Sequence, residues 1–418
     1  MLQLLSHQDM PLAGTVAEAR FIRAAAPMTV EVLCPDAAGA YVAEWRRLPE
    51  DCLEPNIFLE PGFALAAARH LAKRRAPRFL FVWEGNTAGQ RKLLAVCPLA
   101  PAGHFAGFLP ARIWTHEQAP LGTPLLDRTR AEEALAAIFA YCRAHLPRAA
   151  GLMFPVLPQE GAVARLLAAS AAAEGREIQI FGAHQRAILG AGLEPQRYLE
   201  RSITSVRRRK LKRARKLLEA RGTVTFRVLR EPSEVNDAAE AFLALEAKGW
   251  KGRRGTAFLK SPERAGFARE LVSKLASEGK YFIASLDLNG QPVAMGLVLE
   301  SGRRAYWWKV TYDEDFATYS PGVLFTLELT RVLLDDAKIV LTDSCASADH
   351  PMIDHIWSER MAIADLLIAV DAGRPQGFAA LATRERLRRA LRGRLKEIVL
   401  HLRRWKRALG HAPGHVQG

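Results

Sequence analysis

The stretch Ser320-Pro321-Gly322 could bind an anion, because a helix is expected to begin there and continue at helical apolar spacing from Val323 to Leu333. Free peptide N–H groups at a helix start attract phosphate, and a glycine lets the ligand come close to the backbone. The same three residues also suit an ordinary helix start, with a capping serine and a proline in the first turn. The stretch therefore predicts either a phosphate site or a simple helix cap.

A second group of polar residues follows "KIVLTDS", residues 338–344, which is predicted to be a buried strand. Asp343 ends this strand, and strand ends in open α/β sheets face the ligand crevice; it could equally be a loop or capping carboxylate. His350 could transfer a proton near neutral pH, although an Asp-His-Pro run is also common at a helix start. Cys345 would need a lowered pKa and a nearby base to act as a nucleophile, and we interpret it as a buried, inert thiol.

Several function classes find no support in the sequence. It contains no P-loop, GxSxG or HExxH motif, which would indicate nucleotide hydrolysis, a serine hydrolase or a zinc protease. The five cysteines are scattered and form no CxxC pair, which argues for reduced thiols and against a structural metal. No apolar run approaches the ~20 residues that span a bilayer, and the first residues do not resemble a secretory signal. We expect a cytoplasmic, metal-free protein.

The C-terminal half shows the element order β-α-α-β-β-β-α-β-α-β. Asn289-Gly290 joins two of its strands and is a strong hairpin signal. The predicted strands are 223–230, 280–288, 291–300, 303–312, 338–344 and 362–370, and the predicted helices are 235–250, 263–279, one that begins at 320–322, and one near 351–361.

The N-terminal half repeats this order more faintly. Its predicted strands are 29–33, 78–85, 91–100, 113–126, 151–157 and 177–182, and its predicted helices are 41–47, 62–73, 131–145 and 163–175. The sequence therefore predicts an α/β protein, in the α+β sense, of two tandem mixed-sheet modules. We expect an N-terminal module at 1–192, a basic linker helix at 193–222, a C-terminal module at 223–372, and a basic helix with a tail at 373–418.

The net charge of +15 is concentrated in two segments. Residues 201–216 contain nine Lys/Arg and no acid, and residues 384–407 contain eleven Lys/Arg and two acids. The first is by default a solvated linker helix, although its charge could contact tRNA, acidic polysaccharide or lipid. The second carries one apolar stripe, formed by Leu387, Leu391, Leu395, Ile398, Leu402, Trp405 and Leu409.

Such a stripe can lie on an anionic membrane or pack on its own protein, and we favour packing. Peripheral membrane contact through 384–409 is the alternative. Stacking aromatics are missing from both basic segments except Trp405, so we expect no DNA binding.

The chain resembles the GNAT acyltransferase superfamily, and more closely its CelD-type branch, which is associated with cellulose or other exopolysaccharide formation. The stretches that carry the resemblance are "FLALEAKGWKGRRGTAF" (242–258), "YWWKVTYDEDFATYSPGVLF" (306–325), "TDSCASADHPMIDHIWSERM" (342–361) and, in the first half, "EPNIFLEPGFALAAARHL" and "LLAVCPLA". The resemblance covers most of the chain to about Val370 and is specific for the branch but weak for the substrate.

The resemblance implies acetyl-CoA or another acyl-CoA as co-substrate and a sugar, polysaccharide precursor or small amine as acceptor. A peptide N–H on the strand that contains Trp307–Thr311 would polarise the thioester carbonyl. The implied cofactor-binding residues are Trp308, Lys309, Val310, Ser320, Gly322, Val323 and Leu324. The implied catalytic residues are Glu246 as general base, with Asp343, His350 and Tyr312.

One departure weakens the resemblance. The family's phosphate turn carries several small residues, whereas "TYSPGVLF" offers only Gly322. The corresponding place in the N-terminal half has no glycine and carries Asp127, Glu132 and Glu133, so that module is expected to lack a cofactor site. Two alternatives stay open: a Fem-like transferase that uses aminoacyl-tRNA, and a non-catalytic accessory protein of exopolysaccharide biosynthesis.

Overall fold

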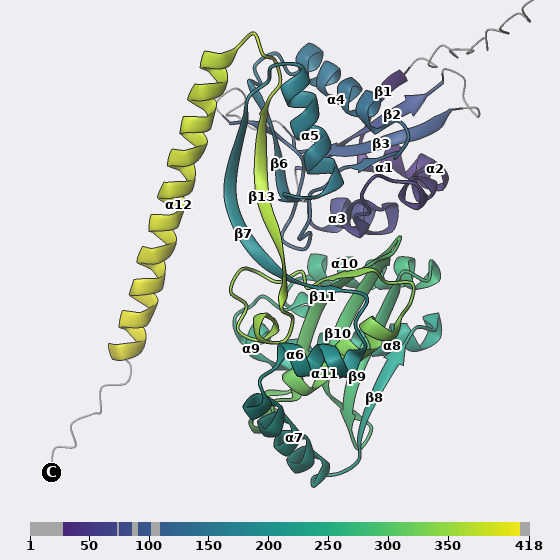
Figure 1. The fold of residues 1–418 in the computed structure, drawn as a ribbon, viewed down its shortest axis with the longest axis vertical. Helices are drawn as coiled ribbons and strands as arrows, with labels where there is room; N and C mark the ends of the chain where they lie inside the picture. Colours follow the sequence, from purple (N-terminus) through teal and green to yellow (C-terminus); the bar gives the residue numbers. More distant parts are fainter. Residues whose placement is uncertain (1–27, 73–74, 86–90, 102–108, 410–418) are drawn as a thin grey trace, which may run out of the picture.

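The computed structural model describes residues 28–72, 75–85, 91–101 and 109–409 of the 418-residue chain. Two halves lie one above the other along the longest axis, and a long C-terminal helix stands beside them (Figure 1). We call residues 28–190 the N-terminal module and residues 224–343 the C-terminal module.

The N-terminal module contains the strands and helices expected from its periodicity, except around 113–126, where only one two-residue strand, β5 (Leu125–Leu126), lies within the predicted strand. In chain order its elements are β1 (Met28–Leu33), α1 (Pro35–Ala38), α2 (Val42–Arg47), α3 (Pro61–His70), β2 (Arg78–Glu84), β3 (Lys92–Leu99), β4 (Ala111–Arg112), β5 (Leu125–Leu126), α4 (Ala131–His145), β6 (Gly151–Pro158), α5 (Ala162–Ala173) and β7 (Ile178–Gly190).

Two helices, α6 (Pro195–Ser202) and α7 (Ser205–Glu219), connect the modules where one basic helix was predicted. Glu194 and Thr204 cap them with side-chain oxygens. The C-terminal module follows with β8 (Val224–Leu229), α8 (Pro232–Lys248), α9 (Trp250–Arg253), α10 (Pro262–Ser277), β9 (Tyr281–Leu288), β10 (Gln291–Ser301), β11 (Arg304–Tyr312), α11 (Pro321–Asp335) and β12 (Leu341–Asp343).

The strand β13 (Glu359–Ala369) follows the C-terminal module in the sequence but pairs with strands of the N-terminal module. The helix predicted near 351–361 is wrong, because the chain forms the 3-10 turn η6 (Ile353–His355) there before β13 begins. β13 pairs antiparallel with β6 on one side and β7 on the other, inside the N-terminal module. Its apolar residues are buried there, with Leu367 and Ile368 inaccessible to solvent. The last strand of the chain therefore completes the first module.

One continuous sheet runs through the described part of both modules, because β13 and β12 both pair with β7. Its order is β4-β6-β13-β7-β12-β11-β10-β9-β8, and a second sheet has the order β1-β2-β3-β5. β7 is longer than predicted because it pairs with β13 along most of its length and with β12 at its end. Figure 1 shows β7 and β13 running from the upper half of the molecule toward the lower half.

The modules also share a hydrophobic core. One cluster joins Trp45 and Phe63 of the first module to Phe242, Phe267 and Trp308 of the second. Ion pairs surround this contact, including those of Glu270 with Arg69 and His70, Arg46 with Glu278, and Arg304 with Glu54. Apolar burial and paired charge together hold the two modules in one arrangement.

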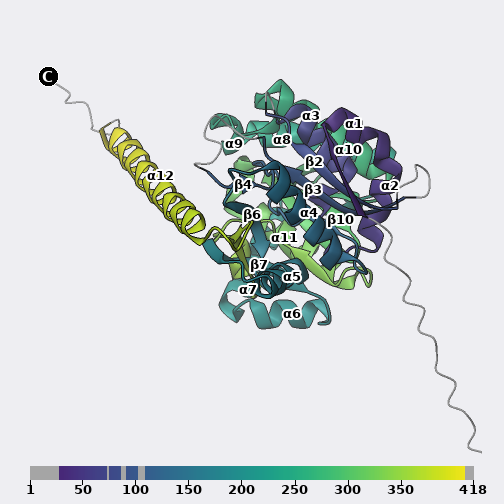
Figure 2. The ribbon, with the colours of Figure 1, turned by 90° about the horizontal axis from the view of Figure 1, so that it is seen from above.

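The C-terminal helix α12 (Pro375–Leu409) leaves the body after its first turns. Phe378, Leu381 and Ala382 pack against Phe181 and Leu367, whereas the rest projects outward, as the view from above shows (Figure 2). The preferred packing of the stripe on the body is therefore wrong for its first part: Leu387, Leu391, Leu395 and Ile398 are 53–60% exposed. The side chains of Leu402, Trp405 and Leu409 lie outside those that the structure describes.

Candidate active site

A pocket of about 640 Å³ opens where β11 and β12 separate. The two strands pair in parallel only from Arg304 to Tyr306 on β11. Beyond Tyr306, β11 continues next to β10 alone, and the start of α11 and the loop after β12 line the gap. A separation between neighbouring strands exposes peptide groups that would otherwise bond across the sheet, so this gap is the place where backbone could contact a ligand.

The start of α11 faces this pocket through Ser320, Pro321, Gly322 and Val323. Ser320 adopts a left-handed backbone (φ 53°) and makes no side-chain cap. Its carbonyl accepts from the N–H groups of Val323 at 3.0 Å and Leu324 at 3.1 Å, and Pro321 has no N–H. Among the described residues, only the N–H of Gly322 in this turn is without a partner, so the turn offers fewer donors than the sequence suggested.

Gly322 is needed for shape as well. A Cβ at this position would lie 3.2 Å from Cδ1 of Tyr312 and 3.8 Å from Sδ of Met352. Tyr312 also lines the pocket, and its catalytic role stays a prediction. Leu324, by contrast, lies outside this pocket and lines a second one between α7 and α11, which does not favour the predicted contact with the coenzyme.

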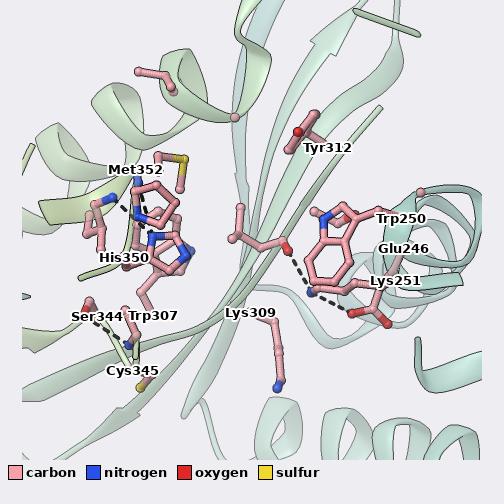
Figure 3. A pocket seen from close by; sticks show the side chains of 18 of the residues that line it. Glu246, Trp250, Lys251, Trp307, Lys309, Tyr312, Ser344, Cys345, His350 and Met352 are labelled. Carbon is pink, nitrogen blue, oxygen red and sulfur yellow. Dashed lines mark hydrogen bonds and ion pairs between the residues drawn. The ribbon is translucent and has the colours of Figure 1, made fainter. Parts of the chain in front are cut away.

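Glu246 and Lys251 form an ion pair at the pocket wall (Figure 3). Glu246 is buried, with one carboxylate oxygen 2.9 Å from Lys251 Nζ and the other accepting from the N–H of Phe258 at 2.9 Å. Lys251 Nζ also donates to the carbonyl of Val310 at 3.1 Å. These contacts suit a positioning role for Glu246 better than the predicted role of general base.

The Lys251 contact shows how Val310 is oriented. Because the carbonyl and the N–H of one strand residue point to the same edge, the Val310 N–H points away from β10 and toward the gap. The N–H of Asp313, three residues later, bonds the carbonyl of Val293 in β10, which agrees with this alternation. Val310 therefore presents the kind of peptide donor that could polarise a carbonyl in the pocket.

His350 lines the opposite side of the pocket. Burial lowers its pKa, which favours a neutral ring at pH 7. Its Nδ1 accepts long hydrogen bonds from the N–H groups of Met352 at 3.4 Å and Ile353 at 3.5 Å. In this tautomer Nε2 carries the proton, so His350 is arranged as a hydrogen-bond donor rather than a base.

Asp343 is engaged elsewhere. Its Oδ2 lies 2.6 Å from Nη2 of Arg186 on β7, both side chains are buried, and its Oδ1 accepts from the N–H of Cys345 at 2.8 Å. Asp343 does not line the pocket, whereas the residues after it, Ser344 to Ser347, do. Burial raises the pKa of the Cys345 thiol well above its usual value, in agreement with an inert cysteine.

Trp308 and Lys309 lie on the face of β11 opposite α11. The indole of Trp308 donates to the carbonyl of Gln118 at 2.8 Å, so its side chain binds the N-terminal module. Lys309 Nζ lies 5.6 Å from the ring centre of Phe258 and 4.9 Å from that of Trp308. Lys309 is thus directed away from the α11 turn, which does not favour the predicted contact with coenzyme phosphates.

Two comparisons with known proteins bear on this geometry. Residues 205–339 match the model of a family described as an acetyltransferase (GNAT) domain. This match covers about a third of the chain and lies mainly in the C-terminal module. The match starts with helix α7, contains β11 and the α11 turn, and ends before β12. A search of curated proteins found no match for the chain.

Several solved structures resemble the chain at low identity. The crystal structure of FemX aligns with 79% of this chain and 94% of its own, at 10% identity and a TM-score of 0.50. A tandem GNAT protein from the clavulanic acid biosynthesis pathway aligns with 81% of this chain and 98% of its own, at 16% identity and a TM-score of 0.39. The C-terminal domain of a putative lysylphosphatidylglycerol synthetase from Agrobacterium fabrum aligns with 82% and 94%, at 11% identity and a TM-score of 0.49. At such identities, the likeness to FemX supports the fold alone.

Sequence reasoning missed the residue that holds Asp343. Arg186 lies 157 positions away in the sequence. The strand that contains it was predicted to end at residue 182, four residues before Arg186. The lining by Ser344–Ser347 and Met352 was also missed, although the rule that strand ends face the crevice could have indicated it. Among the described residues, no cluster of His, Cys, Asp and Glu could hold a metal ion.

Proposed function

We propose that the protein is an acyl-CoA-dependent acyltransferase that acylates an amine or hydroxyl of a small acceptor. The observation that carries the proposal is the gap between β11 and β12, with the Val310 N–H on one side and the N–H of Gly322 at its end. GNAT domains generally use acyl-CoA as co-substrate, and this gap is where an acyl thioester would meet both peptide donors.

In this proposal the thioester carbonyl accepts from the Val310 N–H, and a coenzyme phosphate contacts Gly322 at the α11 turn. The acceptor nitrogen or oxygen forms a bond to the carbonyl carbon as the C–S bond breaks. The acceptor loses one proton and the coenzyme thiolate gains one. The Nε2–H of His350 and the phenol of Tyr312 are the donors we assign to the departing sulfur. Glu246 positions the Val310 peptide through Lys251.

A substitution at Gly322 tests the coenzyme site. Gly322→Glu places a carboxylate next to the Gly322 N–H, the donor of this turn that has no partner among the described residues. Repulsion of phosphate should then abolish coenzyme A binding in titration calorimetry. Gly39→Glu is the matched control, because a side chain at that glycine meets nothing within 4 Å. Retained affinity in Gly322→Glu, with an unchanged melting temperature, would refute the placement of the coenzyme.

A Fem-like, aminoacyl-tRNA-dependent transferase is the second candidate, and helix α7 favours it. Arg209 and Lys212 line a second pocket of about 600 Å³ between α7 and α11, and among the described residues neither has an ion-pair partner. Phosphate backbones bind to such unpaired cations. Thermal shifts with acetyl-CoA, longer acyl-CoAs and tRNA distinguish the candidates, because a ligand that binds only the folded state raises its melting temperature.

Two further partners belong to the proposal. We propose a saccharide of exopolysaccharide biosynthesis as one candidate acceptor, on the basis of the resemblance to the CelD-type branch. If neither coenzyme A nor tRNA raises the melting temperature, a non-catalytic accessory role in that process replaces the acyltransferase proposal. Peripheral membrane contact rests on two features of α12: the exposed apolar stripe, and the excess of basic residues in 384–407, which contain eleven Lys/Arg and two acids. No helix in the described ranges has the length and apolar run needed to cross a membrane.

A further inference from the structure

Lys309 is a cation without a counter-ion in the pocket of the C-terminal module. Its side chain is half-buried, it lines the pocket, and no hydrogen bond or ion pair joins it to any residue in the described ranges. A buried ammonium is costly unless it is paired. The aromatic rings of Trp308 and Phe258, 4.9 and 5.6 Å from Nζ, compensate only part of that cost.

A β-bulge directs this side chain. In the pairing of β10 with β11, Leu297 faces Lys309 and Val298 faces Trp307, so Trp308 is an extra residue. Neighbouring strand residues normally point to opposite faces, but the extra residue allows Trp308 and Lys309 to share one face. Trp307 stays on the other side, where it packs against Phe325 of α11. The bulge thus turns the ammonium away from the proposed coenzyme side.

The carboxylates nearest to Lys309 are already paired. Glu246 binds Lys251 and the Phe258 N–H, and Glu117 binds Arg264 at 2.9 Å. The Cys345 thiol, which extends to the same side as Lys309 in Figure 3, is kept neutral because burial raises its pKa. Lys309 therefore leaves one net positive charge on this side of the pocket, and among the described residues no other acidic group near it is known to neutralise it.

The N-terminal module forms the wall behind Lys309. The bond from Trp308 to the carbonyl of Gln118 holds the loop 116–118 in place. Burial and the charge of Lys309 lower the pKa of His116 to about 3, so this histidine is neutral. Its Nδ1 accepts from the Gln118 N–H at 3.3 Å, and its Nε2 is buried without a partner in the described residues. The Nε2–H of His116 is therefore a hydrogen-bond donor without a partner among the described residues, in addition to the unpaired ammonium of Lys309.

We propose that Lys309 binds an anionic group, a carboxylate or a phosphate, of the molecule that accepts the acyl group. The acceptors are then acidic amines or alcohols, such as amino acids or phosphorylated amino sugars, rather than neutral sugars or polyamines. This inference rests on the proposed function, which places the coenzyme on the α11 side of β11 and leaves the Lys309 side for the acceptor.

The first test measures Lys309 itself and needs no activity. In protein labelled with [ε-¹³C]lysine, NMR follows the titration of Lys309, whose pKa burial lowers to about 8. Inorganic phosphate or acetate should raise this pKa, because a bound anion favours the ammonium. Lys309→Met identifies the signal. A pKa that neither anion changes would overturn the proposal.

The second test compares matched acceptors in acyl transfer: amino acids against their amides, and amino sugar phosphates against the free amino sugars. Lys309→Met should raise KM for the anionic member of each pair by roughly ten- to a hundredfold, the worth of a charged hydrogen bond, with kcat nearly unchanged. Lys309→Arg should keep most of the preference, and the exposed Lys338→Met is the control.

Two outcomes separate the possibilities. If Lys309→Met lowers kcat equally for charged and neutral acceptors and removes an inflection near pH 8, Lys309 is a general base and anion recognition is refuted. Coenzyme A affinity should not change in Lys309→Met. If the wild-type protein fails to bind coenzyme A while phosphate still raises the Lys309 pKa, the proposed function falls and the anion site stands.

Discussion

Replacing Asp343 by asparagine separates a catalytic role for this residue from a structural one. The sequence singled out Asp343 as the best-placed acid, whereas the structure pairs it with Arg186 at 2.6 Å, with side chains 3% and 2% exposed. Arg186 also donates to the carbonyl of Pro120 at 3.0 Å. The pair joins β12 of the C-terminal module to β7 of the N-terminal one, so its loss should weaken the contact between modules.

The expected cost follows from burial. Asp343→Asn removes the charge and leaves the guanidinium of Arg186 buried without a counter-ion, which typically destabilises a protein by about 3–5 kcal/mol. Arg186→Met should cost a similar amount by leaving Asp343 unpaired. The double variant should be much less destabilised than the sum of the two, because it contains no unpaired buried charge.

Urea unfolding followed by tryptophan fluorescence measures all four proteins, and coenzyme binding is titrated alongside. Asp349→Asn, an exposed carboxylate in the following loop, is the matched control and should unfold like the wild type. If Asp343→Asn keeps wild-type stability and coenzyme affinity but loses turnover, Asp343 is catalytic and the structural reasoning is refuted. Additive destabilisation in the double variant would show that the two charges do not depend on each other.

Two other predictions concern stability and surface binding. The pKa of Lys309 is about 8 in the folded protein against 10.5 for a free side chain, so the burial penalty is complete below pH 8 and falls as pH rises toward 10.5. Lys309→Met should therefore stabilise the protein at pH 7 by at most about 3 kcal/mol, a gain that shrinks above pH 8; no gain in urea unfolding would show that the ammonium is not desolvated. On α12, Leu391→Glu with Leu395→Glu should abolish sedimentation with phosphatidylserine vesicles, whereas Ala379→Glu with Ala380→Glu, on exposed positions of the same helix, should retain most of it. Equal binding by the two double variants would contradict insertion of the stripe.

Local patterns predicted most elements of this protein. Helix α4 begins and ends at the predicted residues, Ala131 and His145, because its apolar periodicity and terminal residues act within a few turns. The hairpin at Asn289-Gly290 formed as expected, with both residues at positive φ. The Ser320-Pro321-Gly322 helix start was also found, because proline and glycine constrain the backbone locally.

The sequence alone thus determined the α/β class, the order of most elements, and the helix start at Ser320-Pro321-Gly322. Only the tertiary structure decided where β13 pairs, that Asp343 binds Arg186, and which way Lys309 points. Each of these depends on a partner far away in the chain or on one extra residue in a strand, and neither leaves a periodic pattern in the sequence. The exposure of the α12 stripe was decided in the same way, because an amphipathic helix has the same sequence whether its apolar face is covered or free.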